Sequence, residues 1–388
     1  MDKFGKSQPI TRVEDQRFLT GFGKYIDDIA PADALHAFFF RSPIAHGIIT
    51  NLDVTAASEC EGVVAIIVAQ DLIDSVINMD LEGALVKNRD GSDGAKPPRP
   101  LLAVERVRHV GEAVAMIIAE TLQQAQDAAE LIEFDYDELA VQLALAPGEI
   151  DIHAEAPGNL AFDWEMGDAE KTQREFDKAA HVVKLEVGDN RIIVNSIEPR
   201  GCYVEFNGER LHVALNAQGV WGHWDRLSNM LNMPKDNIRV TNPDTGGGFG
   251  MKGMAYPEAY VLAYAGMKLG RSIRWMSSRT EAMLTDNAGR DLVSLAEFAF
   301  DSDYRIQAYR VHTDCNLGAY NSQFAQRIQT QLFSRVLMGA YDVQATYLSV
   351  KGYYTNTTCV DAYRGAGRPE AIYILERLMD RAAREFGI

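Results

Sequence analysis

A glycine-rich stretch between a predicted strand and a predicted helix constrains this chain more than any other feature of its sequence. Residues 245–254 read TGGGFGMKGM and include five glycines. Glycine weakens the interior of helices and strands and readily adopts positive φ angles, so this stretch is predicted to be a loop. Its backbone can approach another group without an intervening Cβ atom. The residues alone leave three interpretations: a phosphate-binding loop, a tight structural turn, or a backbone surface that faces a metal cofactor.

Two nucleotide-binding motifs fit the stretch poorly. Gly248, Gly250 and Gly253 satisfy GxGxxG, but the acidic residue expected about 20 positions later is missing from residues 271–276 (RSIRWM). Walker A requires a GK pair followed by Ser or Thr, whereas Lys252 follows a methionine and precedes a glycine. A nicotinamide-dependent dehydrogenase is therefore an alternative that rests on these three glycines only.

Composition and charge exclude several classes of protein. Apolar residues make up 47% of the 388 residues and charged residues 24%, which is typical of a globular chain long enough for two domains. The net charge of −17 opposes binding to nucleic acid or to an anionic membrane. Residues 1–18 lack the apolar core of a signal peptide, and no apolar run reaches the roughly 18 residues of a membrane span. We therefore expect a cytoplasmic protein without nucleic-acid or membrane partners.

The cysteines give no sign of a metal centre. Cys60, Cys202, Cys315 and Cys359 are far apart in the sequence and form no CxxC pair. Zinc and iron–sulfur sites need closely spaced thiolates. We expect buried, reduced thiols at these positions.

The first part of the chain reads as mixed helix and strand. Residues 62–69 (GVVAIIVA) and 111–119 (GEAVAMIIA) are apolar and rich in β-branched residues, as buried strands are. Residues 120–132 follow with helical spacing behind a Thr121 cap. The polar, Pro- and Gly-rich residues 87–100 between the strands predict a loop inside one domain.

Periodicity lapses at residues 147–159, which predicts a domain boundary there. We therefore divide the chain into residues 1–146 and residues 147–388, in an α+β fold. In the second part the pattern predicts strands at 210–216 and 237–243 and helices at 223–233, 257–269 and 371–386.

Several ordered motifs resemble the molybdenum-binding large subunit of the xanthine dehydrogenase, aldehyde oxidase and aerobic carbon monoxide dehydrogenase family. One group resembles the N-terminal α/β hammerhead domain and the other resembles the first part of the mixed α/β molybdopterin-binding domain. The resemblance covers almost the whole chain. The first group is 12–29 (RVEDQRFLTGFGKYIDDI), 41–47 (RSPIAHG) and 107–115 (VRHVGEAVA); the second is 190–201, 244–252 (DTGGGFGMK) and 362–371 (AYRGAGRPEA).

The resemblance implies which residues surround the cofactor. Gln218 matches the glutamine whose amide hydrogen-bonds an oxo ligand of molybdenum. Phe249 matches the phenylalanine of the glycine loop, and Arg364 matches the arginine of the loop on the other side of the metal. The implied cofactor-binding residues are Gln218, Gly247, Gly248, Phe249, Gly250, Ala362 and Arg364, with Gln218, Phe249 and Arg364 closest to molybdenum.

The chain departs from the family at three points. Gly365 stands where the carbon monoxide enzymes have a copper-binding cysteine, and Cys359 lies on the wrong side of the arginine to replace it. Gly253 stands where xanthine dehydrogenases have a glutamate that grips the purine. The family's general-base glutamate is expected beyond Ile388. We therefore expect the N-terminal portion of a large subunit, truncated or naturally split, with no catalytic residue of its own and no activity without the remainder.

The function implied by the resemblance is that of a molybdenum hydroxylase. Such an enzyme oxidises an aldehyde or an N-heterocycle with oxygen from water. The cofactor is molybdenum-molybdopterin, in its cytosine dinucleotide form, with iron–sulfur clusters and FAD on partner subunits and the C-terminal half of the large subunit as a further partner. The alternative is a non-catalytic orphan fragment of such a subunit.

Five other residues carry weaker expectations. Glu198 and Arg200 (IEPRG) are predicted to form a buried pair that supports the glycine loop. Arg335 is a candidate for facing the substrate. His46 and His109 are predicted to be structural histidines rather than metal ligands.

Overall fold

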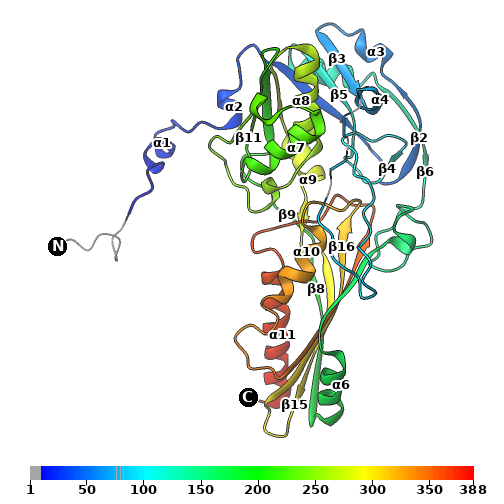
Figure 1. Ribbon diagram of the computed structural model, residues 1–388, viewed down its shortest axis with the longest axis vertical. Helices are drawn as coiled ribbons and strands as arrows, with labels where there is room; N and C mark the ends of the chain where they lie inside the picture. Colours follow the sequence, from blue (N-terminus) through cyan, green and yellow to red (C-terminus); the bar gives the residue numbers. More distant parts are fainter. Residues whose placement is uncertain (1–9, 76, 79, 82) are drawn as a thin grey trace, which may run out of the picture.

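The computed structural model describes residues 10–75, 77–78, 80–81 and 83–388. It confirms an α+β fold built around two large sheets (Figure 1). The seven-stranded sheet has the order β12-β11-β10-β13-β1-β5-β3 and the five-stranded sheet the order β7-β17-β16-β15-β8. No helix among the described residues has the length and apolar character that a membrane crossing requires.

Strands from distant parts of the sequence form the seven-stranded sheet. Its antiparallel pairs include β1 with β5 and β10 with β11, and β1 joins the two groups by pairing in parallel with β13. The bounds are β1 (Leu35–Arg41), β3 (Val63–Val68), β5 (Ala113–Ala119), β10 (Gly201–Phe206), β11 (Leu211–Leu215), β12 (Ile238–Thr241) and β13 (Ile273–Met276).

The proposed boundary at 146 falls in residues 139–156, which form no helix or strand. The sheet nevertheless joins strands from both sides of it. The division into residues 1–146 and 147–388 therefore stays a prediction.

Local signals account for the helices next to this sheet. The helix α8 (Pro257–Leu269) has proline in its first turn and ends at Gly270, which is left-handed at φ 62°. The helix α5 (Leu122–Ala129) begins at Thr121, whose side chain accepts a hydrogen bond from the Gln124 N–H. Both agree with the sequence pattern, although α5 is shorter than predicted. One apolar cluster lies between this sheet and α7 (Trp221–Leu231) and α8.

The five-stranded sheet is long and packs on the C-terminal helix α11 (Arg368–Phe386), as the lower part of Figure 1 shows. None of its strands was predicted from the sequence. Its strands are β7 (Leu160–Gly167), β8 (His181–Asp189), β15 (Leu292–Phe300), β16 (Ile306–Gly318) and β17 (Ala345–Tyr354).

Smaller elements complete the described fold. They are the sheet β4 (Arg106–Val107), β2 (Gly47–Asp53) and β6 (Glu133–Glu138), the pair β14 (Ala288–Gly289) and β9 (Ile192–Ile193), the α-helices α1 (Asp15–Leu19), α2 (Ile26–Ile29), α3 (Thr55–Ser58), α4 (Ala69–Asp74), α6 (Ala169–Lys178), α9 (Arg279–Thr285) and α10 (Ala325–Arg327), the 3-10 turns η1 (Pro157–Asn159), η2 (Lys235–Asn237) and η3 (Met251–Gly253), and the π-helix η4 (Ile328–Leu332).

Candidate cofactor and substrate site

The glycine loop, residues 245–254, lies between β12 and α8 and touches the loop before α11, which contains Ala362. Gly250 has a φ of 102°, and a Cβ atom built on it would lie 2.4 Å from the carbonyl oxygen of Ala362. A side chain at this position would therefore be strained and would push the two loops apart. The glycine allows two segments that are distant in the sequence to meet through their backbones.

Gln218 follows β11 and contacts the same loop. Its Oε1 accepts a hydrogen bond from the Gly250 N–H at 2.7 Å, and its own N–H donates to the Lys252 carbonyl at 3.0 Å. A Cβ atom on Gly248 would lie 2.6 Å from that Oε1. Because Oε1 already has a donor, the free end of the amide is Nε2, which can donate to an oxygen atom of a ligand.

Phe249 and Arg364 lie on the exposed side of the two loops. Phe249 has a φ of 52°, which is uncommon for a residue with a side chain, and it is 43% exposed. The Cζ of Arg364 is 6.0 Å from the centre of the Phe249 ring. Within the described part of the chain, neither Gly247 nor Phe249 makes a hydrogen bond, so their N–H groups are free to donate.

These donors fit an oxygen-rich, anionic cofactor. The two free N–H groups, the Nε2 of Gln218 and the guanidinium of Arg364 are all donors. The glycines allow Gln218 and Ala362 to pack directly against the loop that carries these N–H groups, because Cβ atoms on Gly248 and Gly250 would clash with them. The family resemblance implies that all of these residues surround the cofactor. The structure brings them together, and their roles in cofactor binding stay predictions.

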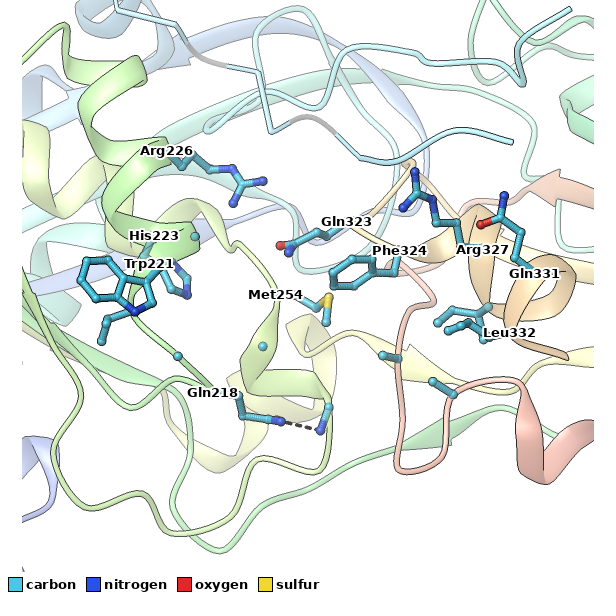
Figure 2. A pocket seen from close by; sticks show the side chains of 18 of the residues that line it. Gln218, Trp221, His223, Arg226, Met254, Gln323, Phe324, Arg327, Gln331 and Leu332 are labelled. Carbon is cyan, nitrogen blue, oxygen red and sulfur yellow. Dashed lines mark hydrogen bonds between the residues drawn. The ribbon is translucent and has the colours of Figure 1, made fainter. Parts of the chain in front are cut away.

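A cavity of about 630 Å³ opens beside this cluster (Figure 2). Gln218, Gly250 and Ala362 line it, whereas the other predicted cofactor residues, Gly247, Gly248, Phe249 and Arg364, do not. Gly253 also lines the cavity. At this position, where xanthine dehydrogenases have a glutamate that binds the purine, this chain therefore has no side chain.

Most of the polar residues that line the cavity were missed by the sequence analysis. They come from α7 on one side and from the segment just before α10, α10 itself and η4 on the other. Arg335, the weaker candidate, does line the cavity. The spacing of Arg327, Gln331 and Arg335 at intervals of four residues was a signal of one polar helical face. The missed residues are Trp221, His223, Arg226, Gln323, Arg327 and Gln331.

His223 is a neutral group in the cavity wall. Burial, and then the positive charge of Arg226, lower its pKa to about 4. Its Nδ1 lies 2.9 Å from the hydroxyl of Tyr260. At neutral pH this side chain therefore adds hydrogen-bonding capacity to the cavity but no charge.

The predicted Glu198–Arg200 pair is wrong. Glu198 instead accepts a hydrogen bond from the Gly246 N–H at 2.7 Å and pairs with Lys252 at 3.1 Å. It therefore does support the glycine loop, but with a different partner. Arg200 points the other way, toward carboxylates brought in by α8 and by the turn after α9, which no pattern near residue 200 reveals.

Arg200 belongs to a group that we call the buried ion cluster: Arg41, Arg200, Glu258, Glu281 and Asp286. Each side chain is at most 11% exposed. Arg200 bonds to Glu258 at 2.8 Å and to Asp286 at 2.6 Å, and Arg41 bonds to the other oxygen of Glu258 at 2.8 Å. Burial alone raises the pKa of Glu258, but the guanidinium groups of Arg200 and Arg41 outweigh it and hold that pKa below its ordinary value.

Burial is confirmed for the two histidines and for three of the four cysteines, and it is wrong for Cys60. His46 and His109 are buried, and each has a ring nitrogen within 2.9 Å of a backbone carbonyl oxygen. All four cysteines are free; three are buried and Cys60 is half-buried. Among the described residues, no group of three or more His, Cys, Asp or Glu side chains is arranged to hold a metal ion.

Gly365 has no room for a cysteine. Its φ is 102°, and a Cβ atom on it would lie 2.3 Å from the Cγ of Pro369. Pro369 lies in the first turn of α11, where a rigid ring cannot move aside. A copper-binding thiol at this position would require the loop to change.

Comparison with known families gives two matches that together cover most of the chain. Residues 152–388 match the molybdopterin cofactor-binding domain, and residues 20–140 match the a/b hammerhead domain of aldehyde oxidase and xanthine dehydrogenase.

Individual relatives match along nearly the whole chain. The nicotine 6-hydroxylase large subunit of Paenarthrobacter nicotinovorans is 30% identical over 99% of this chain and 47% of its own length. The nicotinate dehydrogenase large molybdopterin subunit of Eubacterium barkeri is 27% identical over 97% of this chain and 85% of its own length. The structure of quinoline 2-oxidoreductase from Pseudomonas putida 86 superposes with a TM-score of 0.90 at 30% identity, over 98% of this chain and 48% of that one. The chain thus spans about half the length of the first and third relatives and most of the second.

Proposed function

Since this chain belongs to the molybdopterin cofactor-binding family of aldehyde oxidase and xanthine dehydrogenase, we propose that it is the cofactor-binding subunit, or the N-terminal portion of it, of a molybdenum hydroxylase. The observation that carries the proposal is the contact of Gln218 with Gly250, beside the contact of Gly250 with Ala362. Gln218, Gly250 and Ala362 come from three segments that are distant in the sequence, and all three line one cavity, which supports the proposal.

The chain's own residues would hold the cofactor and position the substrate. When bound, a molybdenum cofactor supplies oxygen transfer from water and takes up the electrons removed from the substrate. Gln218 would donate from Nε2 to an oxygen of the cofactor, with its orientation fixed by the Gly250 N–H. The N–H groups of Gly247 and Phe249 and the guanidinium of Arg364 would donate to further oxygen atoms. The apolar side chains of Phe324 and Met254 would limit the access of water to the cavity.

Among the two substrate classes, we favour N-heterocycles over aldehydes. Nicotine, nicotinate and quinoline, which appear in the names of three relatives, are all N-heterocycles. We further propose the cytosine dinucleotide form of the cofactor, iron–sulfur and FAD groups on partner subunits, and a C-terminal partner half. The names of the relatives as large subunits support the assignment to a complex.

Molybdenum content tests this proposal. In protein purified with its natural partners, Gln218→Ala should keep the fold and lower the molybdenum per chain, because the amide that donates to the cofactor is lost. Gln123→Ala on α5, which hydrogen-bonds Asp127 at an exposed site, is the matched control. Unchanged molybdenum in Gln218→Ala would reject the assigned role, and absence of molybdenum from the wild-type complex would reject the function.

A further inference from the structure

The cavity combines positive charge with an absence of negative charge. Arg226, Arg327 and Arg335, which we call the cavity arginines, line it, and no aspartate or glutamate in the described part of the chain does so. A cavity lined by arginines and by no acidic residue is unusual for a chain with 55 acidic and 38 basic residues. Gln323 and Gln331 add neutral amide groups to the same wall.

The cavity arginines are not neutralised by the chain. Over the described residues, none of the three forms an ion pair with a carboxylate, whereas Arg41, Arg200 and Arg290 each do. Guanidinium groups remain charged at every physiological pH. Three such groups around one cavity repel one another unless an anion lies between them.

The cavity arginines come from opposite walls. Arg226 lies on α7, and Arg327 ends α10 just before the π-helix η4. Figure 2 shows Arg226 and Arg327 on the side of the cavity away from Gln218, with Phe324 and Met254 between them and the Gln218–Gly250 hydrogen bond. π-helical segments are rare and occur frequently at functional sites.

From this arrangement we infer that the cavity binds a substrate with a carboxylate group, held by the cavity arginines, and with an apolar ring that reaches toward Gln218. Phe324, Ile328 and Leu332 supply the apolar contacts for the ring. Guanidinium groups bind carboxylates through charge-assisted, often bidentate hydrogen bonds. The inference rests on the proposed function and narrows its substrate class to carboxylated N-heterocycles.

Two probes of the same shape test the inference in the complex purified with its partners. Pyridine-3-carboxylate carries the charge, and pyridine-3-carboxamide does not. Isothermal titration calorimetry should give an affinity for the carboxylate at least about tenfold higher, since one charge-assisted contact contributes about that factor. Equal affinities, or no measurable binding of the carboxylate, would overturn the inference.

Variants then assign the preference to residues. Arg226→Gln and Arg327→Gln, on opposite walls, should each lower the affinity for the carboxylate about tenfold and leave that for the carboxamide unchanged. Arg239→Gln on β12, an exposed arginine outside the cavity, is the matched control and should change neither. An equal loss in Arg239→Gln would show a general charge effect and overturn the inference.

Molybdenum analysis of the same samples separates the two proposals. A carboxylate preference in a complex without molybdenum would uphold the carboxylate site and reject the hydroxylase. Molybdenum in a complex that binds both probes equally would uphold the hydroxylase and reject the carboxylate site. Oxidation rates for the two probes should follow the binding preference in a complex that holds molybdenum.

Discussion

The buried ion cluster and the cavity arginines use the same guanidinium group in opposite ways. In the cluster, Arg200 and Arg41 share Glu258 and are at most 11% exposed. In the cavity, Arg327 and Arg335 are exposed and have no carboxylate partner in the described part of the chain. Charges that hold the fold are neutralised by the chain itself, and charges that serve a ligand are left for the ligand to neutralise. Glu258→Gln and Arg327→Gln test this contrast directly, whereas Gly250→Ala and His223→Gln test the backbone and the neutral histidine beside the cavity.

The largest effect is expected from the buried ion cluster. Glu258→Gln leaves two buried guanidinium groups without their shared carboxylate and should lower the free energy of unfolding by about 3–5 kcal/mol. Urea denaturation measures the change. Glu209→Gln, an exposed position in the turn before β11, is the control. A loss below about 1 kcal/mol would mean that the cluster does not stabilise the fold as described.

Gly250→Ala tests the backbone contact between the two loops. Its φ of 102° and its approach to Ala362 predict a loss of about 1–3 kcal/mol in the free energy of unfolding, together with less molybdenum in the complex. Gly188→Ala, where a Cβ atom would meet nothing within 4 Å, should change neither quantity. Equal free energies of unfolding and equal molybdenum contents in the two variants would contradict the predicted strain at Gly250.

Acidification should destabilise the protein through His223, which lies in the cavity wall. Because its pKa is lowered to about 4 from an ordinary value near 6.5, the unfolded chain binds the proton more readily between these pH values. Stability is therefore complete above about pH 6.5 and is lost as pH falls toward 4, with about 2 kcal/mol lost at pH 5.

The measurement for His223 is the difference in unfolding free energy between pH 7 and pH 5. His223→Gln should show a smaller difference than the wild type, because its side chain does not titrate. Other groups titrate equally in both proteins and cancel in the comparison. Identical pH dependence in the two would show that His223 is not held neutral by the fold.

Arg327→Gln should have the smallest effect on stability. An exposed arginine without an ion pair can be replaced with a change of about 0.5 kcal/mol or less in the free energy of unfolding. A loss as large as that in Glu258→Gln would remove the distinction between the two regions. Thermal denaturation of the variants used in the binding experiment provides the measurement.

Local features of the fold could be predicted from the sequence, and distant pairings could not. The ends of α8 were predictable because proline and glycine mark them directly. The parallel pairing of Leu35 with Ile273 was not, since nothing near either residue identifies the other. The five-stranded sheet was missed for a related reason: β16 and β17 pair in parallel, and their pattern is mostly buried on both faces.

Prediction of the site residues from the sequence has the same limit. Gln218, Phe249 and Arg364 were found because ordered motifs carry them, and the structure places them together. Arg226 was missed because an arginine on a helix looks the same whether it faces solvent or a cavity. The four-residue spacing that includes Arg327 indicates a polar helical face, but it does not reveal whether that face meets solvent or a cavity. The Glu198–Arg200 pair was wrong because proximity in the sequence does not reveal that Lys252 and Glu258 supply the partners.

The position of β1 beside β13 affects how this chain can be recombined with its relatives. Phe39 of β1 meets the edge of Trp275 of β13, with ring centres 5.8 Å apart, in a sheet that spans both matched domains. A chimera joined near residue 146 would combine a β1 from one parent with a β13 from the other and mismatch these rings. Exchanging residues 35–276 as one block keeps the sheet and its packing from a single parent.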